Sequence, residues 1–501
     1  MSLEPHLLYS RQFILGPQLL YPSGPWQNRV VAGGRFVVQA HTHLEITQAR
    51  SENGELTLLG YMLDPAHPKQ NNAEILEAFV KLDWTRNHAE LTQRLGGRWA
   101  LIVALEHETV LFHDAIGARQ VFYSDDSTKE TWCASQVSHI ALALGIQADE
   151  NARIHPLTRE IMVKDDPQYW WPGEATSYRG IKRLLPNHEL CLSPNFSIKR
   201  IWPHQPLPTV DYENALEQSV NLLTGQLLAA SHRFKLALPI TAGLDSRAIL
   251  AATRKIAKET WYYTIMIPPL KRWLPDALVP YLLSKYLSLD YHWISIPPRM
   301  SDEFAKLYLN NAEPAHLLDG RIAEGLTQQF PSNHVSISSL GSEIMRCAYY
   351  ERPETMPRSL NGKKLANWYF KSFTDPETNT IIEDEITRWL ANIQANTFNV
   401  QLLDLYYWEV RVGSWAASGV AEWDLIHETF PLFSNRLLIE TMLAVYIQKR
   451  QDPEYEIYFD LMKKMWPQVL WLPINPHKQL SKAWKSLKRK VRSMLKRFGK
   501  V

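Results

Sequence analysis

Cysteine and long apolar runs are both scarce in this sequence. It has three cysteines in 501 residues, Cys133, Cys191 and Cys347, and they are widely spaced. This spacing argues against a disulfide framework or a cysteine zinc site, and it favours a reducing compartment. No run of about 18 uncharged apolar residues occurs, so no transmembrane helix is expected. The start, MSLEPHLLYSRQF, lacks a basic stretch followed by an apolar one, so no signal peptide is expected.

A strong charge of one sign is missing as well, since the formal net charge is +2. With 45% hydrophobic and 21% charged residues, the composition is that of a globular protein and not of a disordered chain. The length predicts two or three domains. The 18 tryptophans indicate large aromatic cores.

Residues 1–205 are rich in predicted strands. The candidates are 35–41, 56–63, 98–105, 109–115, 120–125 and 131–135, and EHET is expected to connect two of them as a hairpin. Helices are predicted at 72–82 and 136–145. Mixed strands and few helices favour a layered α+β domain. The Pro-rich stretch RIWPHQPLPT (200–209) then marks a boundary.

After residue 210 the pattern changes to alternating helices and strands. Helices are predicted at 212–231, 246–255, 275–287 and 301–311, and strands at 235–240, 261–267, 291–296 and 335–340. This alternation is typical of a parallel sheet, in which ligands bind at the carboxyl ends of the strands. From about 384 the chain is expected to be helical, with a long segment at 402–426.

The stretch TAGLDS follows the first of these strands. Gly243 allows a sharp turn, and the N–H groups before a helix form an anion site to which Thr241 and Ser246 can add hydroxyl donors. Asp245 beside a phosphate suggests a bridging Mg²⁺. The sequence lacks the G-x-x-x-x-G-K-[ST] run of a P-loop. The alternative interpretation is an ordinary βα turn with a Ser/Asp helix cap.

The stretch ITAGLDSRAIL resembles the S-G-G-x-D-S loop of PP-loop ATP pyrophosphatases, and most of all the glutamine-dependent asparagine synthetases. Five further blocks are similar to that family in the right order. They are GGRWALIVALEHETVLFHDAIGARQVFYS (96–124), CASQVSHIALALG (133–145), LLPNHELCL (184–192), SLGSEIMRCAYY (339–350) and HETFPLFSNRLLIE (427–440). Thr241 and Ala242 depart from the family's Ser and Gly, but both are small.

The resemblance implies a layered α+β sandwich of the Ntn-hydrolase type, followed by an α/β parallel-sheet PP-loop ATP pyrophosphatase domain with a helical C-terminal part. The expected divisions are 1–205, a glutamine amidotransferase type II-like domain, 210–476, the PP-loop domain, and 477–501, a basic tail. The implied reaction uses ATP and Mg²⁺. A carboxylate is adenylated, pyrophosphate leaves, and ammonia or an amine displaces AMP to form an amide.

The resemblance also assigns roles to individual residues. Asp245 and Glu343 are the expected magnesium ligands. The expected catalytic residues are Asp245 and Lys478, which lies in INPHKQL. The residues expected around the pyrophosphate are Thr241, Gly243, Leu244, Asp245 and Ser246. The segment from Thr264 to Met266 is expected to contact adenine through its backbone. Lys478 also has a simpler interpretation, as a solvated tail residue. Arg411 could face the acceptor pocket, and an ion-paired or snorkelling arginine is the favoured alternative.

The first domain has lost the residues that glutamine hydrolysis requires in this family. Ser2 stands where active members carry a cysteine nucleophile, and Leu59-Gly60 replaces the Asn-Gly oxyanion element. Gly97 replaces the aspartate that holds the glutamine amine. We therefore expect a domain without glutaminase activity. Cys133 is expected to be buried in a strand.

Two functional hypotheses follow. The first is an AMP-forming amide ligase that uses free ammonia or an amine, and the second is a non-catalytic scaffold, with surface polysaccharide assembly as one setting. The tail alternates apolar and basic residues as an amphipathic helix, which suits a membrane surface or a docking partner equally. Nothing else supports nucleic-acid binding, and a homodimer stays open. The expected location is cytoplasmic, with the inner membrane face as a second setting for the tail.

Overall fold

A computed structural model describes residues 7–125, 130–146, 155, 157–158, 170–268, 270–272, 274–312, 316–351, 360–369, 376–394 and 397–476. Ser2 and the whole of 477–501, with Lys478, lie outside the described residues. Within the described ranges, no helix is both long enough and apolar enough to cross a membrane.

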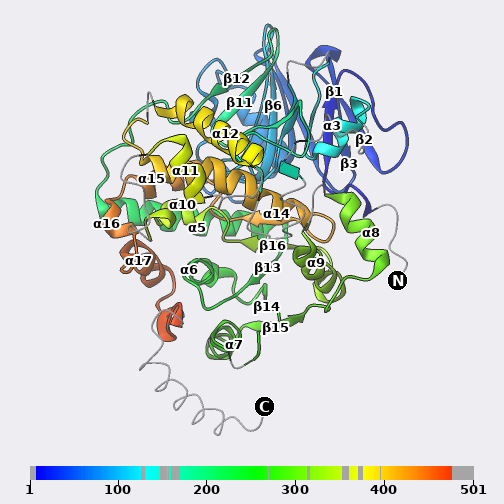
Figure 1. Ribbon diagram of the computed structural model, residues 1–501. Coiled ribbons are helices and arrows are strands. Elements are labelled where there is room, and N and C mark those ends of the chain that lie inside the picture. Colours follow the sequence, from blue (N-terminus) through cyan, green and yellow to red (C-terminus); the bar gives the residue numbers. More distant parts are fainter. Residues whose placement is uncertain are drawn as a thin grey trace.

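The first half of the chain contains two antiparallel sheets, which lie at the top of Figure 1. The first has the order β10-β8-β9-β1-β3-β2. Its strands are β1 (Phe13–Gly16), β2 (Trp26–Val31), β3 (Phe36–His41), β8 (Phe122–Ser124), β9 (Cys133–Ala134) and β10 (Ile181–Arg183). The second has the order β12-β11-β7-β6-β5-β4. Its strands are β4 (Ile46–Ser51), β5 (Gly54–Leu63), β6 (Gly96–Ala104), β7 (Thr109–His113), β11 (His188–Ser193) and β12 (Ser197–Arg200).

Alternating side chains make these two sheets a sandwich. Leu15 and Val38 of the first sheet share one core with Leu59 and Ile102 of the second. The intervening residues Leu58 and Leu101 face the opposite side and join the largest core. On the outer side of the first sheet, α3 (Val137–Ala143) packs over β8 and β9. The predicted layered α+β sandwich is therefore present.

Two short helices complete this half, α1 (Asn72–Phe79) and α2 (His88–Thr92). The capping box of Asn71 and Glu74 fixes the start of α1. The predicted EHET hairpin joins β6 to β7, where the N–H of Leu105 donates to the carbonyl of Glu108 at 2.7 Å. The sequence patterns missed β1, β2, β4, β10, β11 and β12. Strands β2, β4 and β12 carry polar residues on exposed or half-exposed faces, β1 and β10 are short, and β11 begins with the polar residues His188 and Glu189.

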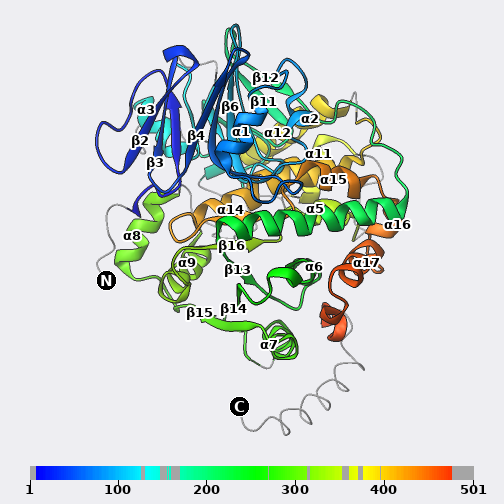
Figure 2. The same ribbon diagram turned by 180° about the vertical axis from the view of Figure 1, so that it is seen from behind.

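The second half contains a five-stranded parallel sheet of order β15-β14-β13-β16-β17. Its strands are β13 (Lys235–Pro239), β14 (Thr260–Met266), β15 (Asp290–Ser295), β16 (His334–Ser338) and β17 (Thr429–Pro431). Leu236 and Tyr262 pack towards α6 (Leu244–Ala252), whereas Ala237 and Tyr263 pack towards α9 (Leu317–Gln329). Helices therefore cover both faces, as Figures 1 and 2 show. The predicted parallel sheet is correct, although α9 and β17 were not anticipated.

The long helix α5 (Tyr212–Arg233) runs between the sandwich and the parallel sheet (Figure 2). The other helices of this half are α7 (Pro275–Leu287), α8 (Asp302–Asn311), α10 (Ser342–Met345), α11 (Gly362–Tyr369), α12 (Pro376–Gln394), α13 (Leu402–Tyr406), α14 (Ala417–Glu422), α15 (Arg436–Leu443), α16 (Ile447–Arg450) and α17 (Glu456–Met465). The single helix expected at 402–426 is instead three pieces, because a π-helix, Tyr407–Ala416, separates α13 from α14 and α14 ends at Glu422. Wider π turns occur often at functional sites.

Candidate active site

The order of the parallel strands defines one switch point. From β13 the chain adds β14 and β15 on one side, then returns to place β16 and β17 on the other. The loops after β13 and β16 therefore diverge at the carboxyl edge of the sheet and leave a crevice where ligands bind in such folds. Asp245 lies in the loop and helix after β13, and Glu343 lies in the helix after β16.

The TAGLDS loop is closed by its own hydroxyls. The N–H of Gly243 donates to Thr241 Oγ1 at 3.1 Å, and the N–H of Thr241 donates to Ser246 Oγ at 3.2 Å. Gly243 is the N-cap of α6 and has no side chain to cap it. Two of the N–H groups that were expected to bind a phosphate thus already donate to hydroxyl oxygens. An anion could bind them only after the Thr241 and Ser246 side chains rotated away. Leu244 is buried and offers only its backbone.

Asp245 is held against the loop after β16. Its Oδ1 accepts from the Ser342 hydroxyl at 2.7 Å and from Arg346 Nε at 3.0 Å. Tyr458, in α17, donates its hydroxyl to the carbonyl of Ser342 at 2.8 Å. The Gly341 turn that presents Ser342 has φ of 93°, a conformation that favours glycine. The segment after β16 therefore contacts the Asp245 carboxylate directly, and α17 supports that segment through Ser342.

Glu343 and Asp245, 98 positions apart, are brought close enough to repel each other electrostatically. Burial, followed by the charge of Asp245, raises the pKa of Glu343 to about 7, although Arg346 and Arg411 oppose the rise. Two carboxylates that disfavour each other's ionisation are a fitting environment for a divalent cation, which would relieve the repulsion. The donor set therefore suits Mg²⁺, whose ligands are oxygen atoms.

The expected adenine segment lies beside the loop. Thr264 sits in β14 next to Ile240, the residue before Thr241, and Met266 ends the same strand. The Thr264 hydroxyl donates to the Ile240 carbonyl at 2.6 Å and accepts from the Tyr291 hydroxyl at 2.7 Å. The Thr264 hydroxyl therefore already makes its hydrogen bonds within the protein, so a ligand would contact this residue through its backbone.

The segment before the tail returns to the loop. The N–H of Asn475 donates to the carbonyl of Ala242 at 2.9 Å. Arg247, buried in α6, donates to the carbonyls of Val469 and Leu472 at 2.6 and 3.0 Å. The start of the INPHKQL segment is thus bound to the TAGLDS loop, whereas Lys478 itself lies outside the described residues.

Sequence reasoning missed three residues of this arrangement. Ser342 and Arg346 lie inside the SLGSEIMRCAYY block and flank Glu343, so the block itself was the available signal. Tyr458 carries no sequence signal, because only the packing of α17 on α6 brings it to Ser342. Arg411 stacks on Trp415, with its guanidinium carbon 3.7 Å from the ring centroid.

The positions that correspond to the glutamine site are used for structure in this chain. Leu59 is fully buried between the sheets, and the N–H of Gly60 donates to the Glu45 carbonyl at 2.9 Å. Gly97 has φ of +102°, and a Cβ there would lie 2.3 Å from the carbonyl oxygen of Tyr61. Aspartate therefore does not fit at Gly97 with this backbone. Cys133 is buried in β9 as expected.

Next to Gly97, a buried ionic cluster joins the two halves. Arg98 donates to both Asp424 and Glu428, and Arg119 donates to Glu428 at 2.8 Å. Arg11 lies 3.9 Å from the same glutamate. Burial alone would raise the pKa of Glu428, but Arg119, Arg98 and Arg11 outweigh it and lower the pKa to about 2. The cluster is a buried ionic junction in which three arginines surround two carboxylates.

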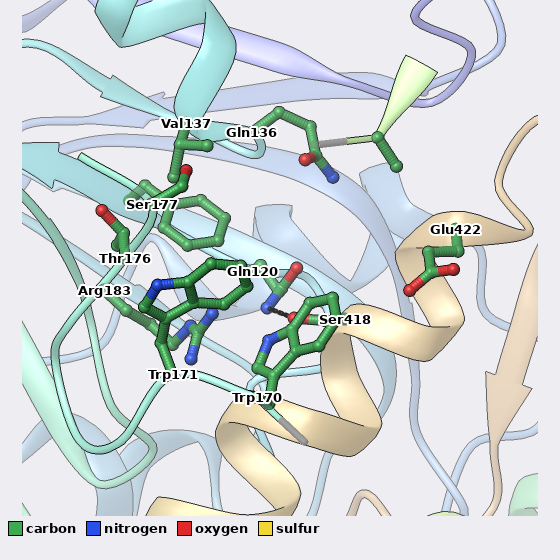
Figure 3. Close-up of a pocket in the computed structure, with 12 residues that line it drawn as sticks. Gln120, Gln136, Val137, Trp170, Trp171, Thr176, Ser177, Arg183, Ser418 and Glu422 are labelled. Atoms are coloured by element: carbon green, nitrogen blue, oxygen red, sulfur yellow. Dashed lines mark hydrogen bonds between the residues drawn. The ribbon is translucent and has the colours of Figure 1, made fainter. Parts of the chain in front are cut away.

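Two cavities lie near this junction. The smaller, about 10 Å³, has room for roughly one water molecule. Figure 3 shows its wall, where Trp170 and Trp171 lie side by side and Gln120 donates to Ser418 at 2.9 Å. The larger, about 400 Å³, adjoins the α9 face of the parallel sheet and shares Trp170 and Glu422 with the smaller one.

No family model and no curated protein matches this sequence. Among solved structures, an allosteric regulatory enzyme of purine biosynthesis is similar at 9% identity and a TM-score of 0.25, over 75% of this chain and 88% of that one. The glutamine phosphoribosylpyrophosphate amidotransferase from B. subtilis, complexed with ADP and GMP, is similar at 10% identity and a TM-score of 0.24, over 71% and 75%. Likeness of this size supports no statement about activity.

Proposed function

We propose that this protein is an ATP-dependent, AMP-forming ligase that joins a carboxylate to an amine or ammonia and has no glutaminase activity. The observation that carries the proposal is the pairing of Asp245 with Glu343 at the switch point of the parallel sheet. The topology alone predicts a ligand crevice at this place, and the two carboxylates give it the chemistry for a magnesium nucleotide.

Each residue of the site has a separate proposed role. Asp245 and Glu343 would hold Mg²⁺, which supplies charge neutralisation for the pyrophosphate leaving group. Thr241 and Ser246 would exchange their internal hydrogen bonds for bonds to phosphate oxygens, which would free the N–H groups of the loop. Arg346 holds the Asp245 carboxylate in position. The carboxylate substrate would attack the α-phosphorus with loss of pyrophosphate, and the amine would then displace AMP from the acyl-adenylate.

The absence of glutaminase activity is supported by the first half of the chain. The buried Leu59, the occupied N–H of Gly60 and the close approach at Gly97 leave no oxyanion donor or amine anchor at the positions where the resemblance places them. The nitrogen would then come directly from ammonia or an amine.

The test is pyrophosphate release from ATP and Mg²⁺ with a panel of carboxylates and amines. The Asp245→Asn variant should lower the rate by about 100-fold or more, because the metal contributes several kcal/mol to charge stabilisation. Asp276→Asn is the matched control, since Asp276 lies in the first turn of α7 after the neighbouring strand β14 and should have little effect.

Two results would contradict the proposal. One is equal pyrophosphate release by the Asp245→Asn variant. The other is the absence of AMP with every carboxylate tried, which would favour the non-catalytic scaffold instead.

A further inference from the structure

The larger cavity, which we call the α9 cavity, lies directly beside the candidate active site. Its wall includes Ser338 and Leu340, which immediately precede the Gly341 turn and Glu343. From β14 it takes Tyr263 and Ile265, and from α14 it takes Gly419 and Glu422. The α9 cavity therefore occupies the face of the sheet opposite α6, next to the loop that carries Glu343.

The α9 cavity is too large to be filled by a very small ligand. Its volume of about 400 Å³ falls in the range of organic-ligand pockets. A molecule the size of water or ammonia needs only about 10–15 Å³ of such volume. Ammonia alone would leave most of this space unfilled.

Aromatic rings form much of the wall. Trp170, Tyr263, Trp415 and Trp423 all line it. His316 also lines it, and its ring lies 4.8 Å from that of Trp170. Such rings bind apolar groups, and their faces also attract cations.

The charged residues of the wall are all acidic. Within the described part of the chain, Asp319 and Glu422 line the α9 cavity, and lysine and arginine do not. Glu422 is fixed by the Tyr308 hydroxyl and by the N–H of His316, the latter at 2.9 Å, and its other oxygen lies 3.1 Å from His316 Nδ1. A second carboxylate entering this cavity would be repelled, whereas an ammonium group would be attracted.

Buried polar atoms of the wall lack partners. The indole nitrogens of Trp170 and Trp423, the Nε2 of His427 and the Oγ1 of Thr429 form no hydrogen bond among the described residues. Unsatisfied buried groups are uncommon in folded proteins. Four of them around one cavity leave room for polar atoms of a ligand or for water, and the two indole N–H groups are donors that would pair with an acceptor atom.

We infer that the α9 cavity binds an organic amine with an aromatic or apolar body, and that this amine is the nitrogen donor of the ligase. The assignment as donor rests on the proposed function. The acyl substrate is then expected outside this cavity, because the acidic wall disfavours its carboxylate.

The test is direct binding to the full chain, without ATP, by calorimetry. The probes are 2-phenylethylamine, 2-phenylethanol and 3-phenylpropanoate, which share a ring and differ in charge. The amine should bind about tenfold more tightly than the alcohol, a difference of about 1.4 kcal/mol, and the carboxylate should bind more weakly than both.

Two variants locate the binding site. A side chain added at Gly419 meets no atom within 4 Å, so Gly419→Leu should fill the α9 cavity and weaken amine binding about tenfold without affecting ATP binding. Asp319→Asn should reduce the preference for the amine over the alcohol. Asp384→Asn, an exposed acid on α12, is the control and should change neither.

The inference is overturned if the carboxylate binds as well as the amine, or if Gly419→Leu leaves amine binding intact. It is also overturned if Zn²⁺ binds at His316, Asp319 and Glu422 and excludes the amine. Amine binding without AMP formation from any carboxylate would contradict the ligase and leave the amine site standing. AMP formation with ammonia, without binding of the amine, would support the ligase and contradict the amine site.

Discussion

Glu428, at the junction of the two halves, and Glu343, at the edge of the parallel sheet, are both glutamates placed near other charges. Glu428 is surrounded by Arg11, Arg98 and Arg119, which hold its pKa well below the ordinary range. Glu343 faces Asp245, and its pKa is raised. The charge of Glu428 is already compensated by arginines, whereas the charge of Glu343 would be compensated by an added cation. We therefore expect a structural role for Glu428 and a ligand-binding role for Glu343.

The largest expected effect is at the junction. Arg98→Met would leave Asp424 and Glu428 buried without their main partner, so the free energy of unfolding should fall by about 3–5 kcal/mol. Urea unfolding followed by tryptophan fluorescence measures it. Arg50→Met, at the exposed pair with Glu55, should cost only about 0–1 kcal/mol. Equal losses in the two variants would show that the junction does not depend on this charge pairing.

The next effect concerns Gly97. Restoring the aspartate of the resembling family at this position should destabilise the chain by about 2 kcal/mol or more, because the positive φ and the Tyr61 carbonyl both oppose a side chain. Gly33→Asp is the control, since Gly33 also has positive φ but open space around it. A smaller cost of about 1 kcal/mol is expected there. If Gly97→Asp folds normally and hydrolyses glutamine, the structural interpretation of this half is wrong.

The smallest effect is a pair of pH dependences with opposite sign. The folded-state pKa of Glu428 is depressed to about 2, so its contribution is present at neutral pH and is lost as pH falls below its ordinary value. The stability gap between wild type and Glu428→Gln should therefore narrow in acid. The folded-state pKa of Glu343 is raised to about 7, so its ionised form costs stability as pH rises.

Glu343→Gln should accordingly be more stable than wild type at pH 8, by less than about 2 kcal/mol, and similar in stability at pH 4. Thermal unfolding of both variants across pH measures this, and adding Mg²⁺ should stabilise the wild type and Glu428→Gln but not Glu343→Gln. The same pH dependence in both variants would remove the contrast between the two glutamates.

Local patterns predicted much of the fold. The alternation after residue 210 predicted the parallel sheet, because buried parallel strands and their crossover helices have strong, different periods. The layered first half was predicted as well, although half-exposed β2 and β4 lacked a clear alternation. The π-helix within 402–426 was not predictable, since its sequence reads as one continuous amphipathic helix.

For the site, the sequence by itself determined the chemical character of the TAGLDS loop, because a small-residue turn with an acid in the next helix is a local property. Through its resemblance to a known family, it also predicted that the residues of a glutamine site are missing. Only the tertiary structure decided that Asp245 is bonded to Ser342 and lies near Glu343, that Tyr458 holds the turn, and that an acidic aromatic cavity lies beside them. These depend on strand order and on packing between segments about a hundred or more positions apart, which no local pattern encodes.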